Sequence, residues 1–194
     1  RTVTNFAGAG QPPRLVLLGI NPQQLDRVAP ELARWVTSNT TVVSILAGAE
    51  AASLRARFRN AGDIVRVMPN LPVSVRRGVV GLYSDDADET LRQELSPLFS
   101  ALGLAMWTDS EEKLAAIGAV AGAGPAYVAR FIAALASSGA RLGLPEDLAL
   151  TIARETVLGT AWTAASTGES MDSLAQRVAS PGGTTEAGLE VLDS

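Results

Sequence analysis

The chain has 194 residues, of which 47% are hydrophobic and 19% charged, so it is long and apolar enough to form one or two domains with packed cores. It contains no cysteine and no histidine, which excludes disulfides, thiol nucleophiles, imidazole acid–base chemistry and the usual zinc sites. For the same reason we expect no metal. The net charge is −4 and the basic residues are scattered, so we expect no nucleic-acid partner.

Short apolar runs alternate with helical patterns through the first half of the chain. Runs of strand length lie at residues 14–20, 40–46, 63–68, 79–84 and 104–108, and helices are expected over 24–36, 50–59 and 88–103. Strands that alternate with helices typically form a parallel sheet covered on both faces. We therefore predict an α/β domain over residues 1–108, a partial Rossmann-like parallel sheet.

Three consecutive predicted strands end in small or turn-forming residues. These ends are Gly19-Ile20-Asn21-Pro22, Ile45-Leu46-Ala47-Gly48 and Met68-Pro69-Asn70. Ligands of parallel sheets bind outside the carboxyl ends of the strands, so the three ends together predict a ligand site. Ordinary strand-to-helix turns are the alternative interpretation of each one.

The glycine-rich fingerprint that holds a dinucleotide pyrophosphate is missing from the sequence. Residues 8–10 (Gly-Ala-Gly) provide two of its glycines, but the prolines at 12 and 13 prevent a helix there. Residues 122–124 repeat the pair inside a helical region and are followed by Pro125. The first strand–helix unit of a nucleotide-binding fold therefore has no counterpart in the sequence.

After residue 108 only helices are expected, and we assign residues 109–194 to an all-α domain. The predicted helices run from a cap at Asp109 or Ser110 to about 121, from Pro125 to about 142, from Pro145 to about 166, over 171–179 and over 186–192. The third of these is apolar on more than one side, which predicts burial on two sides. In so small a domain we expect a second copy of the chain to cover it, giving a homodimer or higher oligomer. The alternative is the central helix of a monomeric bundle.

The sequence predicts a cytoplasmic protein without a membrane partner. The longest uncharged stretch of the second half, residues 114–129, is shorter than a bilayer span and contains glycine and proline. No basic segment followed by an apolar one opens the printed sequence.

Residues 180–185 (Ser-Pro-Gly-Gly-Thr-Thr) form a second candidate site. Two glycines free the backbone, and the threonines stand where a new helix begins. Exposed amides at a helix start favour a carboxylate or a phosphate. A plain threonine N-cap is the alternative.

Four ordered stretches resemble the pyrroline-5-carboxylate reductases, which make proline. They are residues 65–72 (VRVMPNLP), 121–128 (AGAGPAYV), 140–145 (ARLGLP) and 180–185 (SPGGTT), and the similarity extends from about residue 14 to 194. The resemblance implies a dinucleotide-binding domain followed by a helical dimerisation domain. It also implies hydride transfer from NADPH or NADH to the C=N bond of 1-pyrroline-5-carboxylate, a cyclic imino acid.

The resemblance assigns roles to individual residues. The substrate carboxylate would rest on Gly182, Gly183 and Thr184, with Thr185 near the ring nitrogen and Ser180 shaping the loop; Thr185 and Ser180 are the catalytic candidates. The cofactor would pass a set of residues at the strand ends, with its nicotinamide near the last two: Gly19, Ile20, Asn21, Pro22, Leu46, Ala47, Met68 and Asn70. Iminium reduction depends on orientation and a bound anion, because the cofactor supplies the hydride, so a chain without His or Cys can perform it.

Two other functions are compatible with parts of the sequence. A family-derived, non-catalytic dimer that has lost cofactor binding would account for four residues that differ from the family's usual ones: Asn21, Leu71, Ala121 and Ala123. A hydroxyacid dehydrogenase of similar build would need a basic catalytic residue. The single lysine, Lys113, lies in the first turn of its predicted helix and suits that role poorly.

Overall fold

A computed structural model describes residues 11–193, and the chain divides into two compact units, Arg1–Ala126 and Tyr127–Ser194. The boundary expected after residue 108 coincides with the end of the last strand, whereas the first unit continues into the helix that follows, because that helix packs on the sheet. The partial glycine motif at residues 8–10 lies outside the described residues.

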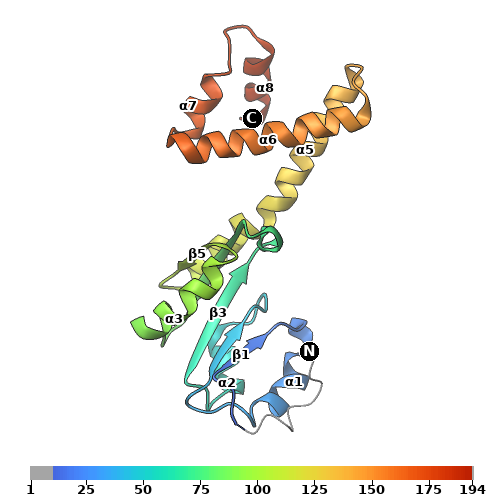
Figure 1. The fold of residues 1–194 in the computed structure, drawn as a ribbon. Helices are drawn as coiled ribbons and strands as arrows, with labels where there is room; N and C mark the ends of the chain where they lie inside the picture. Colours follow the sequence, from blue (N-terminus) through green and yellow to red (C-terminus); the bar gives the residue numbers. More distant parts are fainter. Residues whose placement is uncertain (1–10, 194) are drawn as a thin grey trace. The chain divides into compact units, whose positions relative to one another are not determined.

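The first unit contains a five-stranded sheet in the order β1-β2-β3-β4-β5 (Figure 1). Its strands are β1 (Leu15–Leu18), β2 (Thr41–Ser44), β3 (Asp63–Pro69), β4 (Gly78–Tyr83) and β5 (Gly103–Trp107). The helices between them are α1 (Leu25–Leu32), α2 (Ala51–Arg57) and α3 (Glu89–Ser100). Every strand and helix predicted for this half is present, and the α/β class is confirmed.

Helices cover both faces of the sheet, which explains why its strands are continuously apolar. Val42 and Ile64 pack with α1 and α2, while Val43 and Val65 face the opposite layer with Phe99 of α3. Successive residues of a strand point to opposite faces, so each apolar run fills two core layers. The main core lies in this unit.

Two strands, β4 and β5, run in the direction opposite to that predicted, since β5 is parallel to β4. β4 pairs antiparallel with β3, whereas the other three pairings are parallel. The connection between them is only a 3-10 turn, η3 (Leu71–Val75), which ends at Arg76 in the left-handed conformation (φ 57°). A parallel pair needs a longer crossover, so this connection makes β4 turn back beside β3.

The first two helices after β5 form one continuous helical run. α4 (Glu111–Ile117) passes through a π-helical segment, η4 (Gly118–Gly122), into α5 (Ala123–Arg141). The expected stop near residue 121 and fresh start at Pro125 are therefore wrong. α4 seats closely on the sheet, since a Cβ at Gly81 of β4 would lie 2.8 Å from Leu114.

The second unit continues α5 and adds α6 (Glu146–Thr167), α7 (Met171–Gln176) and α8 (Thr184–Leu192). α5 and α6 meet where Gly139 faces Ala149; a Cβ on Gly139 would lie 3.3 Å from the Ala149 Cβ. Only Ala149 and Ala153 of α6 are buried, so this helix is not the core of a bundle within the chain. Its apolar side chains Ile152, Leu158 and Trp162 are about half exposed (46%, 52% and 53%).

Within residues 11–193, one helical run is long and apolar enough to cross a membrane by length and composition, the 31-residue run Glu111–Arg141, in which an 18-residue window has a mean hydropathy of 1.4. It exceeds the uncharged stretch at 114–129 because the helix continues past Arg130. Exposed apolar helices of this kind also form contacts between proteins.

Candidate active site

The carboxyl ends of β1, β2 and β3 lie side by side because these strands are parallel. Leu18 pairs with Ser44, and Ser44 with Arg66. The segments that follow the three strands are therefore neighbours at one edge of the sheet. The structure brings together there all eight residues expected at the cofactor: Gly19, Ile20, Asn21, Pro22, Leu46, Ala47, Met68 and Asn70.

The turn after β1 is closed by its own asparagine. Asn21 Oδ1 accepts a hydrogen bond from the Gln23 amide at 3.1 Å, and the Asn21 carbonyl accepts one from the Gln24 amide at 2.8 Å. Gly19 is exposed, and a Cβ built on it would have only Ile45 Cδ1 within 4 Å, at 3.8 Å. A flat ring can approach the backbone here, while the first amides of the following helical turn are already bonded.

The turn after β2 presents its backbone at Ala47 and Gly48, next to the exposed side chain of Ile45. Leu46 is only 4% exposed and belongs to the core, whereas Ala47 and Gly48 are exposed. The Leu46 amide donates to Ser44 Oγ at 3.3 Å, and Gly48 has φ 76° with open space where a Cβ would stand. Any contact of Leu46 with a ligand therefore goes through its main chain.

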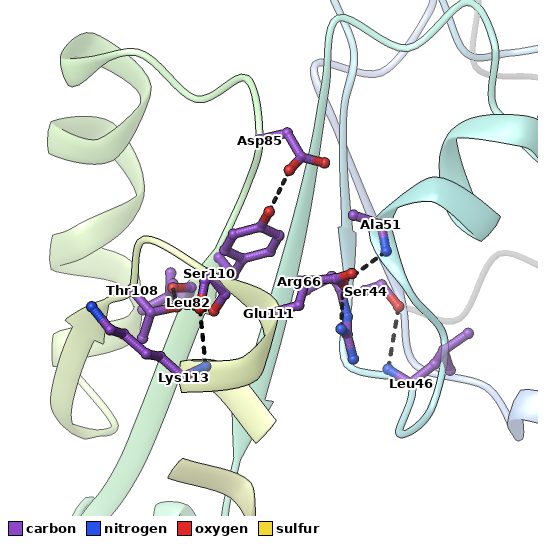
Figure 2. A network of polar contacts seen from close by, with 11 residues as sticks. Ser44, Leu46, Ala51, Arg66, Leu82, Asp85, Thr108, Ser110, Glu111 and Lys113 are labelled. Atoms are coloured by element: carbon purple, nitrogen blue, oxygen red, sulfur yellow. Dashed lines mark hydrogen bonds and ion pairs between the residues drawn. The ribbon is translucent and has the colours of Figure 1, made fainter. Parts of the chain in front are cut away.

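A largely buried polar network joins β3, α2 and α4 next to the carboxyl ends of the strands (Figure 2). Arg66 of β3, with a side chain 10% exposed, forms an ion pair with Glu111 in the first turn of α4. The same Glu111 oxygen accepts the Ala51 amide at 2.9 Å, which fixes the start of α2 just after the Ala47–Gly48 turn. Sequence analysis missed this network, although an arginine inside the apolar run of residues 63–68 was its signal.

Tyr83, the last residue of β4, is a buried phenol with a hydrogen-bond partner. Its hydroxyl donates to Asp85, and this hydrogen bond, with burial as the second cause, raises the pKa of Tyr83 to about 12. Lys113 is exposed and forms an ion pair at 2.7 Å with Asp109, which is also exposed and precedes it by four residues in the sequence. Nothing at Lys113 resembles a catalytic base, which removes the basis for a hydroxyacid dehydrogenase.

The loop at residues 180–185 belongs to the second unit and differs from a threonine-capped helix. Gly183 is the N-cap of α8 and no side chain caps the helix, so the plain threonine N-cap is wrong. Thr184 and Thr185 are the first two helical residues and both are exposed. Their amides, with that of Glu186, are those that an α-helix leaves without an intrahelical acceptor.

Two amides of this loop already have partners. The Gly182 amide donates to Glu186 Oε2 at 2.7 Å, and the Gly183 amide donates to the Ser180 carbonyl at 2.9 Å. Gly182 has φ 73°, a conformation that favours glycine. A carboxylate of the chain itself thus occupies one of the positions expected to hold the substrate carboxylate.

A sheet of this kind, with small residues at the carboxyl ends of its parallel strands and a helical domain after it, defines the class of Rossmann-like dinucleotide-binding proteins with a helical second domain. Comparison with known proteins agrees. A family model of pyrroline-5-carboxylate reductase dimerisation matches residues 111–194. A pyrroline-5-carboxylate reductase of Pseudomonas aeruginosa is 37% identical over 177 residues, covering 91% of this chain and 65% of that protein.

Solved structures give the same result. A pyrroline-5-carboxylate reductase from Coxiella burnetii superposes with a TM-score of 0.83 at 36% identity, covering 93% of this chain and 67% of that one. The Plasmodium falciparum enzyme with NADP bound also gives a TM-score of 0.83, at 25% identity and 93% and 68% coverage. The chain belongs to the pyrroline-5-carboxylate reductase family. It spans 65% of the length of the Pseudomonas relative.

Proposed function

We propose that the protein reduces the C=N bond of 1-pyrroline-5-carboxylate to give L-proline, with NADPH or NADH as the hydride donor. The observation that carries this proposal is the similarity to pyrroline-5-carboxylate reductases over 93% of the chain, through both the strand-end turns and the 180–185 loop. Bound cofactor would supply a hydride to the ring carbon, and the ring nitrogen would take up one proton from the solvent, which gives the secondary amine of proline.

The described residues fit the nicotinamide end of such a cofactor. Gly19, Ala47 and Gly48 leave the main chain accessible, and half-buried Met68 offers an apolar surface to a ring. Leu46 and Asn21 would contribute mainly backbone, since Leu46 is buried and the side chain of Asn21 caps its own turn, while Ile20 and Pro22 would line the site beside them. Within residues 11–193 no glycine-rich turn offers a pyrophosphate site.

The 180–185 loop would hold the substrate. Its helix-start amides at Thr184 and Thr185 suit the carboxylate, and the Thr185 hydroxyl suits the ring nitrogen. Gly182 would join them once Glu186 releases its amide, and Ser180 would shape the loop through its bond from Gly183. Thr185 and Ser180 remain the catalytic candidates.

We also propose that the chain forms a homodimer or higher oligomer through α5 and α6. The support is the family model, which describes dimerisation over residues 111–194, together with apolar side chains on α6 that are about half exposed. The cytoplasmic location expected from the sequence stays a prediction.

The decisive experiment is a titration of the full protein with NADPH and NADH, followed by cyclic imino acids. Saturable quenching of tryptophan fluorescence, and cofactor oxidation with the five-membered imine, are expected. Faster oxidation with the six-membered homologue would change the assigned substrate. No binding at millimolar cofactor would overturn the proposal and favour a non-catalytic dimer.

A further inference from the structure

The side chain of Asn70 is bonded at both of its polar ends, inside the first unit. Its Oδ1 accepts the Val79 amide of β4 at 2.8 Å, and its Nδ2 donates to the Ala121 carbonyl at 3.0 Å. Val79 lies nine residues away and Ala121 fifty-one. One side chain therefore joins the end of β3, the start of β4 and the π segment η4.

Pro125 cannot provide the usual α-helical donor to the Ala121 carbonyl. In an α-helix, the amide of residue 125 would donate to the carbonyl four residues earlier, and proline has no amide hydrogen. The helix nevertheless continues through this position, as a π segment followed by α5. Asn70 supplies from the sheet the hydrogen bond that Pro125 cannot make.

Two glycines provide the space for this arrangement. A Cβ on Gly78 would lie 3.0 Å from Asn70 Oδ1 and 2.3 Å from a Val73 methyl carbon. A Cβ on Gly118 would lie 3.3–3.4 Å from three atoms of the Met68 side chain. The π segment thus lies against the end of β3, where Met68 packs on Gly118 and Asn70 bonds to Ala121.

We propose that Asn70 is a positioning residue that holds the π segment on the sheet, acting through the Ala121 carbonyl in place of Pro125. Its amide is used in the fold and is not directed to the cofactor. Asn70 affects hydride transfer indirectly, because the π segment that it holds also packs, at Gly118, on Met68, which is expected beside the nicotinamide. This kinetic consequence rests on the proposed function; the structural part does not.

The test is a double-mutant cycle that combines Asn70→Asp with Pro125→Ala in the full protein. Asn70→Asp keeps an acceptor for Val79 and loses the donor for Ala121. Pro125→Ala restores a backbone donor for the same carbonyl. We expect Asn70→Asp to lower the melting temperature by about 2–4 °C and to speed amide exchange over residues 118–126 about fivefold. In the Pro125→Ala background both effects should fall by half or more.

Ser74→Ala is the matched control, because the Ser74 hydroxyl bonds only within η3, to the Leu71 carbonyl. It should leave exchange over residues 118–126 unchanged. Should Asn70→Asp fold poorly, Asn70→Ala enters the same cycle. Equal penalties in both backgrounds would overturn the proposal, whatever the activity of the protein.

The kinetic arm separates positioning from direct contact. In an active protein, Asn70→Asp should lower kcat while the Kd for reduced cofactor changes less than about threefold, and Pro125→Ala should restore part of kcat. A loss of cofactor affinity that Pro125→Ala does not restore assigns the amide to the cofactor and overturns the proposal. If no variant binds cofactor, the proposed function fails and the exchange result still decides the role of Asn70.

Discussion

Arg66 and Glu111 form an ion pair between the middle of the sheet and the first turn of α4, with side chains only 10% and 28% exposed. The pair matters beyond its own two charges, because the same carboxylate receives the Ala51 amide. It therefore ties β3, α2 and α4 together beneath the turn that follows β2.

Removal of the Glu111 carboxylate should lower the free energy of unfolding more than the loss of an exposed ion pair does. Glu111→Ala leaves the Arg66 charge shielded and unpaired, and we expect a loss of about 2–3 kcal/mol in the free energy of unfolding, below the full range for a completely buried pair. Urea denaturation measures it. Lys113→Gln, which breaks the exposed pair with Asp109, should be indistinguishable from the parent. Equal small effects of both variants would contradict the supporting role of Glu111.

Tyr83 should make stability fall at high pH. Its hydrogen bond to Asp85, followed by burial, raises the pKa to about 12, so folding favours the protonated phenol. This stabilisation is complete below the unfolded pKa of about 10 and is lost as the pH rises through about 12. Urea midpoints between pH 9 and 12 should therefore fall more steeply for the parent than for Tyr83→Phe. Parallel curves would show that the hydrogen bond adds nothing to folding.

Thr185→Ala should reduce turnover without unfolding the protein, because Gly183 and not a threonine caps α8. We expect a drop in kcat of about tenfold or more, the effect of roughly one lost hydrogen bond in the transition state, with cofactor Kd and oligomeric state unchanged. Thr185→Ser keeps the hydroxyl and should recover most of kcat. A cooperative loss of the oligomer would instead assign Thr185 to the fold.

Glu186→Gln should improve binding of the substrate. The Glu186 carboxylate bonds to the Gly182 amide and would repel a second carboxylate there. Its neutralisation should lower KM for pyrroline-5-carboxylate by about threefold to tenfold, with a smaller change in kcat. Steady-state kinetics at constant cofactor measure this. An unchanged KM would mean that the substrate does not use the Gly182 amide.

Leu158→Glu should dissociate the oligomer. Leu158 is 52% exposed on α6, and a charge at an apolar interface between copies would be left without water or a partner. Sedimentation equilibrium should give the monomer mass. Leu98→Glu, at a similarly exposed leucine (56%) on α3, is the control and should leave the assembly intact.

Local signals in the sequence predicted the elements well. The β-branched run at residues 40–46 became β2, and Ser110 caps α4 through the Lys113 amide, as expected of a serine before an acidic first turn. The sequence also predicted that the turns after β1, β2 and β3 lie together, because the carboxyl ends of successive parallel strands share one edge of the sheet. These features depend on residues close together in the chain.

One error arose where a distant residue decided the outcome. A proline at position 125 predicts a helix start by local rules, yet the helix passes through it, and Asn70 bonds to the carbonyl that the proline leaves. The other error, the direction of β4 and of the parallel β5, has a local cause, because η3 is too short to form the crossover that a parallel pair needs.

The sequence by itself determined the order and type of the elements, the turns at the strand ends and the family to which they belong, since propensity, capping and motif spacing are local properties. Only the tertiary structure decided that Glu111 serves both Arg66 and Ala51, that Glu186 occupies the Gly182 amide, and that Asn70 joins the sheet to the π segment. The partners of a hydrogen-bonding side chain are set by which groups folding brings within about 3 Å, and no sequence pattern specifies that distance across tens of residues.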